Sequence, residues 1–105
     1  MKIKISRIVK SVQTTTELAK LIGAVIDHKR FDEEYVRNVE AKMNRVFYVS
    51  NIEELSHENL QSYTYLFIER LNEDFPASFK EFLYDFFYLK DKVLSKLKVR
   101  WDWEE

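Results

Sequence analysis

The scarcity of glycine and proline constrains this chain most. Its 105 residues include one glycine, Gly23, and one proline, Pro76. An all-β domain needs turn residues of these kinds between many short strands. Long helices with few connections need far fewer. The sequence therefore predicts an all-α fold, and the length fits one domain spanning residues 1–105.

Two long helices are expected in the first half of the chain. Thr14 and Glu17 stand at the spacing of a capping box, and apolar residues recur at helical spacing after them. A helix is thus predicted over residues 14–30. Asp32 suits the N-cap of a second helix, with two glutamates favourably placed behind it. Its end, residues 46–51, is β-branched and aromatic, so we expect that end to fray or become extended.

Two more helices are expected in the second half. Ser56 suits an N-cap, and Leu55 and Leu60 stand at the spacing of a hydrophobic staple. Pro76 suits the first turn of a last helix that runs to about Leu97. The predicted architecture is a single bundle of four main helices.

Both ends of the chain are ambiguous. Residues 3–12 are ambiguous: KIKIS, residues 2–6, alternates like a strand, but the apolar residues from Ile5 onward also fit a helix. We favour a short fifth helix from about residue 5, with a strand as the alternative. The tail LKVRWDWEE also alternates, and a strand, a frayed helix end and a docking tail all fit it.

Composition limits the classes of protein. The chain has no cysteine, which excludes disulfides and thiol catalysis and fits a reducing cytosol. It has no secretory signal pattern and no apolar run of the ~20 residues that a membrane span needs. We therefore expect a cytoplasmic protein that lies outside the membrane. The net charge of −1 is atypical of an autonomous nucleic-acid-binding protein.

Catalysis and cofactors have almost no support in the sequence. It contains no glycine-rich phosphate loop and no paired metal-ligand spacing. His57 fits a polar first-turn residue, and His28 fits a helix end where the dipole favours a cation. We expect a protein that is not an enzyme, has no catalytic residues, and takes no metal, cofactor or small-molecule substrate.

The segment FKEFLYDFFYLKD, residues 79–91, raises the sharpest functional question. Six of its thirteen residues are aromatic, more than one amphipathic stripe of about 100° holds. Phe79, Phe82, Leu83 and Phe86 fit the core stripe of the last helix. The other rings fit either a second packed side or a protein interface. We predict a protein interface formed by this helix and the tail: Tyr84, Phe87, Tyr88, Trp101 and Trp103.

Basic residues on the first two long helices are candidates for phosphate contacts, because lysine and arginine bind nucleic-acid backbones without reading sequence. A solvated face balanced by nearby glutamates is the alternative for each of them. A helix-turn-helix motif does not fit, since the first helix continues through Val25 and Ile26 where that motif needs a turn. The candidates are Lys20, Lys29, Arg30, Arg37, Lys42 and Arg45.

Three segments together resemble the small helical subunit of type III-A CRISPR effector complexes, of the Csm type. They are TTTELAKLIG, FDEEYVRNVEAKMNRVFYV and FKEFLYDFFYLKDKV, and they span about residues 14–94. The chain departs from that family at Ser50 and Asn51, where the family tends to carry a Gly-Arg pair. The resemblance implies a non-catalytic bundle that binds neighbouring subunits and the crRNA–target backbone. It favours Lys29, Arg30, Lys42 and Arg45 for the RNA contact.

Two functions are therefore expected. The first is an antiviral-defence subunit of a CRISPR ribonucleoprotein, whose partners are other protein subunits, in hetero- or homo-oligomers, and RNA. The alternative is a small protein-binding regulator, such as a phage- or plasmid-encoded inhibitor, that acts through its aromatic helix face. A DNA-binding regulator is the least favoured class.

Overall fold

The chain folds into helices joined by short connections. The computed structural model describes the backbone of residues 5–96 and the side chains of residues 7–86. In chain order the elements are α1 (Ile5–Ser11), α2 (Thr15–Asp27), α3 (Glu33–Val46), the 3-10 helix η1 (Ile52–Glu54), α4 (His57–Asp74) and α5 (Pro76–Lys96). These described residues contain no strand. The predicted all-α fold with four main helices and a short helix at the N-terminus is confirmed.

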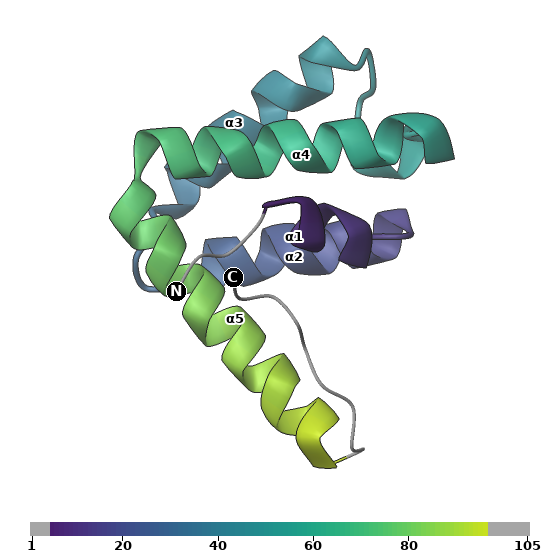
Figure 1. Ribbon diagram of the computed structural model, residues 1–105. Helices are drawn as coiled ribbons and strands as arrows, with labels where there is room; N and C mark the ends of the chain where they lie inside the picture. The colour runs from purple at the N-terminus through teal and green to yellow at the C-terminus, as the bar shows by residue number, and fades with distance from the viewer. Residues whose placement is uncertain (1–4, 97–105) are drawn as a thin grey trace.

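Helix α4 is the centre of the bundle. It packs against α1, α3 and α5, while α2 packs against α3 and η1. Figure 1 shows α4 spanning the molecule and α5 turning away from it after a sharp corner, so that the last turns of α5 extend beyond the other helices. The described buried side chains of α5, Phe79, Phe82 and Leu83, lie in its first part.

The core is built around the wide apolar side of α4. Its inward residues contact helices on more than one side, so its buried surface is broader than that of an ordinary amphipathic helix. Thr64 is buried among them, and its hydroxyl donates to the Leu60 carbonyl at 2.8 Å, which satisfies its polar atom. The buried residues of α4 are Leu60, Tyr63, Thr64, Phe67, Ile68 and Leu71.

The predicted helix starts are confirmed by their caps. The side chains of Thr14, Asp32 and Ser56 each accept a backbone N–H from the residue three positions on, at 3.1, 3.2 and 3.1 Å. The Glu17 carboxylate accepts the N–H of Gln13 at 3.1 Å, one residue before the cap. Each helix thus begins where a side chain satisfies an otherwise unpaired amide.

The N-terminal ambiguity is resolved in favour of a helix from Ile5. Ile8, Val9 and Val12 are buried there, as the helical spacing predicted. Residues 1–4 and 97–105 lie outside the described residues, and so does the predicted conformation of the tryptophan tail. Within the described part, no helix combines the length and apolar character that a membrane crossing requires.

Candidate functional site

The aromatic segment of α5 divides between the core and the surface. Phe79, Phe82 and Leu83 are buried, and Phe86 packs partly against the core, as the apolar stripe predicted. Tyr84 is half-buried. The side chains of Phe87 and Tyr88, with Trp101 and Trp103, lie outside the described residues, so this predicted interface stays a prediction.

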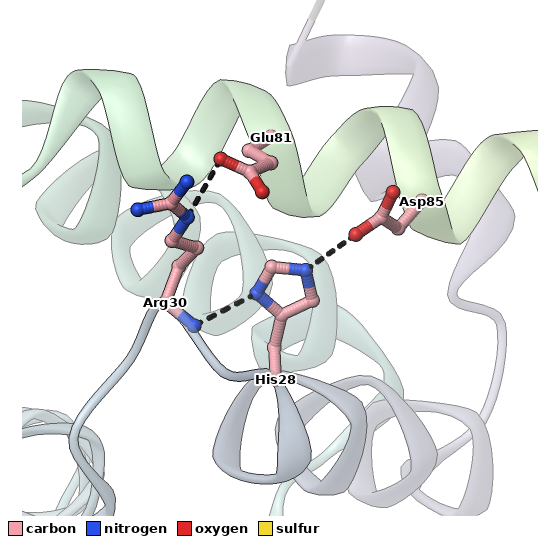
Figure 2. Close-up of polar contacts among 4 residues, drawn as sticks. All are labelled: His28, Arg30, Glu81 and Asp85. Carbon is pink, nitrogen blue, oxygen red and sulfur yellow. Dashed lines mark hydrogen bonds and ion pairs between the residues drawn. The ribbon is translucent and has the colours of Figure 1, made fainter.

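The turn after α2 is joined to α5 by His28. Its Nε2 lies 2.7 Å from Asp85 Oδ2, and its Nδ1 accepts the backbone N–H of Arg30 at 3.2 Å (Figure 2). Because Nδ1 accepts, the proton of the neutral ring is on Nε2, which donates to Asp85. The ring also meets Phe82 edge-on at 5.5 Å between centroids. His28 therefore has a specific partner on α5, beyond the dipole contact that its sequence position suggested.

Two of the six basic candidates are held in ion pairs. Arg30 Nε lies 2.7 Å from Glu81 Oε2 on α5 (Figure 2), so its guanidinium reinforces the junction at His28. Arg37 Nε lies 2.8 Å from Glu33 Oε2, one turn earlier on α3, and this contact raises the pKa of Arg37. These arginines already have carboxylate partners with which a phosphate would compete.

The other four basic candidates are exposed and form no ion pair with any described residue: Lys20, Lys29, Lys42 and Arg45. They do not form one common site. Lys20 lines a cleft of about 290 Å³ beside Phe86, whereas Lys42 lines a separate cleft between α3 and α4. In that second cleft Lys42 is accompanied by Arg70, which the sequence did not single out because only the packing of two helices brings the two cations together.

Among the described residues, the two most exposed large apolar side chains lie at the C-terminal end of α3. The N–H of Tyr48 donates to the Arg45 carbonyl at 3.3 Å, and that of Val49 to the Asn44 carbonyl at 3.0 Å. This pair of bonds is the Schellman motif, whose left-handed position usually holds glycine. Tyr48 holds that position here, with a φ of 56°. The expectation that this end frays or extends is therefore corrected: it closes in a hydrogen-bonded turn.

The side chain of Tyr48 projects away from the described part of the fold. It is 95% exposed, and Val46 beside it is 53% exposed. Phe47 between them instead packs against Tyr63, with ring centroids 5.4 Å apart. The sequence did not predict this turn at Tyr48, because a Schellman motif is usually predicted from a glycine at the left-handed position, and no glycine stands there.

Two other exposed aromatic residues, Phe75 and Tyr65, have local partners. Phe75 meets the Tyr35 ring edge-on at 4.9 Å and the Phe31 ring at 6.4 Å, so it covers part of the core. The Tyr65 hydroxyl bonds to the Glu69 carboxylate, which raises the pKa of Tyr65. The Tyr48 side chain differs from both in having no such contact among the described residues.

The described residues contain no group of three or more histidines, aspartates or glutamates placed to hold a metal ion. Comparisons of the chain with known protein families, with curated proteins and with solved structures found no match. The candidate surfaces are therefore those that the geometry provides: the turn after α3, the cleft between α3 and α4, and the exposed basic residues.

Proposed function

We propose that this protein is a non-catalytic helical binding module that docks on a protein partner through the turn after α3. The observation that carries the proposal is Tyr48, an aromatic residue held in a left-handed conformation and almost fully exposed. A residue other than glycine costs on the order of 1 kcal/mol or more in that conformation.

No described residue offsets that cost, because Tyr48 is 95% exposed. Strained residues that persist without a structural benefit concentrate at binding sites. Tyrosine is also enriched at protein interfaces, where its ring buries a large area and its hydroxyl finds a partner. Val46 beside it adds apolar surface to the same edge.

The test is the substitution Tyr48→Gly, which removes the ring and relieves the strain together. We expect the variant to fold at least as well as the wild type and to lose the stoichiometric protein that the wild type retains after RNase treatment. Tyr65→Ala, at another exposed tyrosine, is the matched control and should keep that partner. Retention of the partner by Tyr48→Gly would refute this choice of surface.

The predicted interface on α5 and the tail is a further part of this proposal, as in a regulator or a phage- or plasmid-encoded inhibitor. It is tested separately with Tyr88→Ala and Trp103→Ala. Loss of the partner in these variants but not in Tyr48→Gly would move the interface to the aromatic helix. Retention in both would remove that helix from the proposal.

The second candidate is a subunit that contacts an RNA backbone, in the manner of the small type III CRISPR subunit. It is favoured by Lys29, Lys42 and Arg45, which are exposed and unpaired among the described residues. Their ammonium and guanidinium groups suit contacts to phosphates, which carry no sequence information. Arg30 is a weaker candidate than the sequence suggested, since Glu81 already holds it.

Charge reversal at these three positions tests the RNA candidate. Affinity for single-stranded RNA should fall, and the slope of log affinity against log salt should decrease by about 0.7 for each phosphate contact removed. Arg30 is left unchanged so that the junction with α5 stays intact. Lys80→Glu, at an exposed position on α5, is the control. Equal binding by the wild type and the triple variant would exclude this function.

A further inference from the structure

A cleft of about 310 Å³ lies between α3 and α4, apart from the turn at Tyr48. Its lining comes from both helices: Tyr35, Asn38, Val39 and Lys42 on α3, and Arg70 and Asp74 on α4. Its volume is at the lower end of the range for small-molecule sites. It therefore accommodates a compact ligand group.

Two tyrosine hydroxyls form hydrogen bonds between α3 and α4, the helices that line the cleft. At one end the Tyr35 hydroxyl of α3 donates to Asp74 Oδ2 of α4 at 2.7 Å. Further along, the Tyr63 hydroxyl of α4 donates to Asn44 Oδ1 of α3 at 2.6 Å. Hydrogen bonds thus join the two helices before and after Lys42 along α3, and they stabilise the shape of the cleft.

Arg70 keeps its hydrogen-bonding capacity in this arrangement. Its Nη1 lies 3.7 Å from Glu73 Oε2 and 3.8 Å from Asp74 Oδ1, both beyond hydrogen-bonding distance. The Asp74 carboxylate is instead engaged by the Tyr35 hydroxyl. Arg70 therefore has two long ion pairs but no hydrogen bond from Nη1 to either carboxylate, and its N–H groups can donate to another acceptor.

Lys42 has no acidic neighbour on its own helix. The positions three and four residues away are Asn38, Val39, Arg45 and Val46. It forms no ion pair within the described part of the chain. The lining thus contains two cations, Lys42 and Arg70, and one carboxylate, Asp74, while Glu73 lies near Arg70 outside the lining.

We infer that this cleft binds the phosphate group of a nucleotide, either free or within an RNA strand. An arginine fork and a lysine point charge from facing helices form a suitable pair for a phosphate, and the Asn38 amide adds a neutral donor. This site is distinct from the protein-docking turn. It shares Lys42 with the RNA candidate, but it adds Arg70, which that candidate does not include.

Calorimetric titration with inorganic phosphate, uridine monophosphate and a uridine hexanucleotide tests the inference. Arg70→Gln and Lys42→Gln should each weaken binding about tenfold, as expected for the loss of one charge-assisted hydrogen bond. Lys20→Gln, at the other cleft, should bind like the wild type. Monophosphate binding as tight as that of the hexanucleotide identifies a free nucleotide as the source. A clear preference for the hexanucleotide identifies a strand.

A readout independent of the variants is the nuclear magnetic resonance spectrum of the wild type. The Asn38 side-chain amide and the Arg70 Nε–H should shift on titration with uridine monophosphate or the hexanucleotide. Absence of binding by all three ligands, or wild-type affinity in Arg70→Gln, would overturn the inference. Because Tyr48→Gly leaves the cleft unchanged, that variant should still bind these ligands, so this inference and the docking proposal fail independently.

Discussion

The two ends of helix α3 (Glu33–Val46) differ in how well their residues suit a helix end. The N-cap is an aspartate, which that position favours, whereas the left-handed position after the helix holds a tyrosine, which it disfavours. At the start, Asp32 accepts the N–H of Tyr35, and Phe31 is buried beside the cap. At the end, Tyr48 takes a position that usually holds glycine and leaves its ring in solvent. One helix thus has one end that agrees with local preference and one that opposes it.

The difference separates structural residues from candidates for function. Where local preference and tertiary packing agree, the residues are explained by the fold alone. Where a residue costs stability and gains no contact, its explanation lies outside the folded chain. The start of α3 belongs to the first kind and the turn at Tyr48 to the second.

The largest expected effect is at the start of α3. Phe31 is buried and meets the rings of Tyr35, Phe75 and Phe82 at 6.4–6.5 Å. Phe31→Ala removes this packing and leaves a cavity, so it should reduce the free energy of unfolding by about 4 kcal/mol. Urea unfolding followed by circular dichroism measures the loss. Phe75→Ala, at a half-exposed ring of the same cluster, should cost clearly less. Equal losses in the free energy of unfolding would show that the difference in burial between Phe31 and Phe75 does not determine how much each ring stabilises the fold.

The next effect concerns the link between α3 and α4 at Tyr63. Burial, and to a lesser degree the Glu40 carboxylate, raise the pKa of Tyr63. Above pH 10 the unfolded chain releases this phenolic proton, whereas the folded chain retains it. Stability that is complete below pH 10 is therefore lost above it, by up to about 1.4 kcal/mol per pH unit.

Comparison with Tyr63→Phe isolates this loss. At pH 9 the variant should be less stable than the wild type by about 1 kcal/mol, because it lacks the hydroxyl bond to Asn44. At pH 11 that difference should be reduced by about 1 kcal/mol, since only the wild type has this phenol to ionise on unfolding. Urea titrations at both pH values measure it. A difference independent of pH would contradict the assigned burial effect.

Much of the fold could be predicted because its signals are local. The caps at Thr14, Asp32 and Ser56 and the proline at the start of α5 each act within one turn of helix. Apolar spacing likewise identified the buried side of each helix. The end of α3 could not be predicted in this way, because its hydrogen-bonded turn lacks the glycine that signals one.

The sites were harder to predict than the helices because they depend on tertiary neighbours. Arg37 stands four residues after Glu33 on one helix, a spacing at which an ion pair can be expected from sequence. Arg30 has no such signal, and only the fold shows that Glu81 on α5 engages it. In the same way, Arg70 gains significance only because α4 packs beside α3. The sequence gives the charge of each side chain and its neighbours along a helix, whereas pairing between helices depends on how they pack.

A smaller effect is expected at the cap of α3. Asp32→Ala removes the acceptor for the Tyr35 N–H and should cost about 1 kcal/mol in the free energy of unfolding. Asp32→Asn keeps a capping oxygen and should lose much less. Both are measured by urea unfolding. A similar loss in both variants would indicate that the charge near the helix dipole matters more than the cap itself.

The smallest effect has the opposite sign and lies at the other end of α3. Tyr48→Gly should raise the free energy of unfolding by up to about 1 kcal/mol, because glycine adopts a positive φ without the clash of a β-carbon. For a domain of this size such a gain raises the melting temperature by about 4 °C or more. Tyr48→Ala removes the ring but keeps the β-carbon, so it should bring no gain. A contrary result is one in which Tyr48→Gly destabilises the protein and Tyr48→Ala does not. That result would show that the ring is dispensable for stability and that Tyr48 is not strained. The argument for an external partner at this turn would then fail.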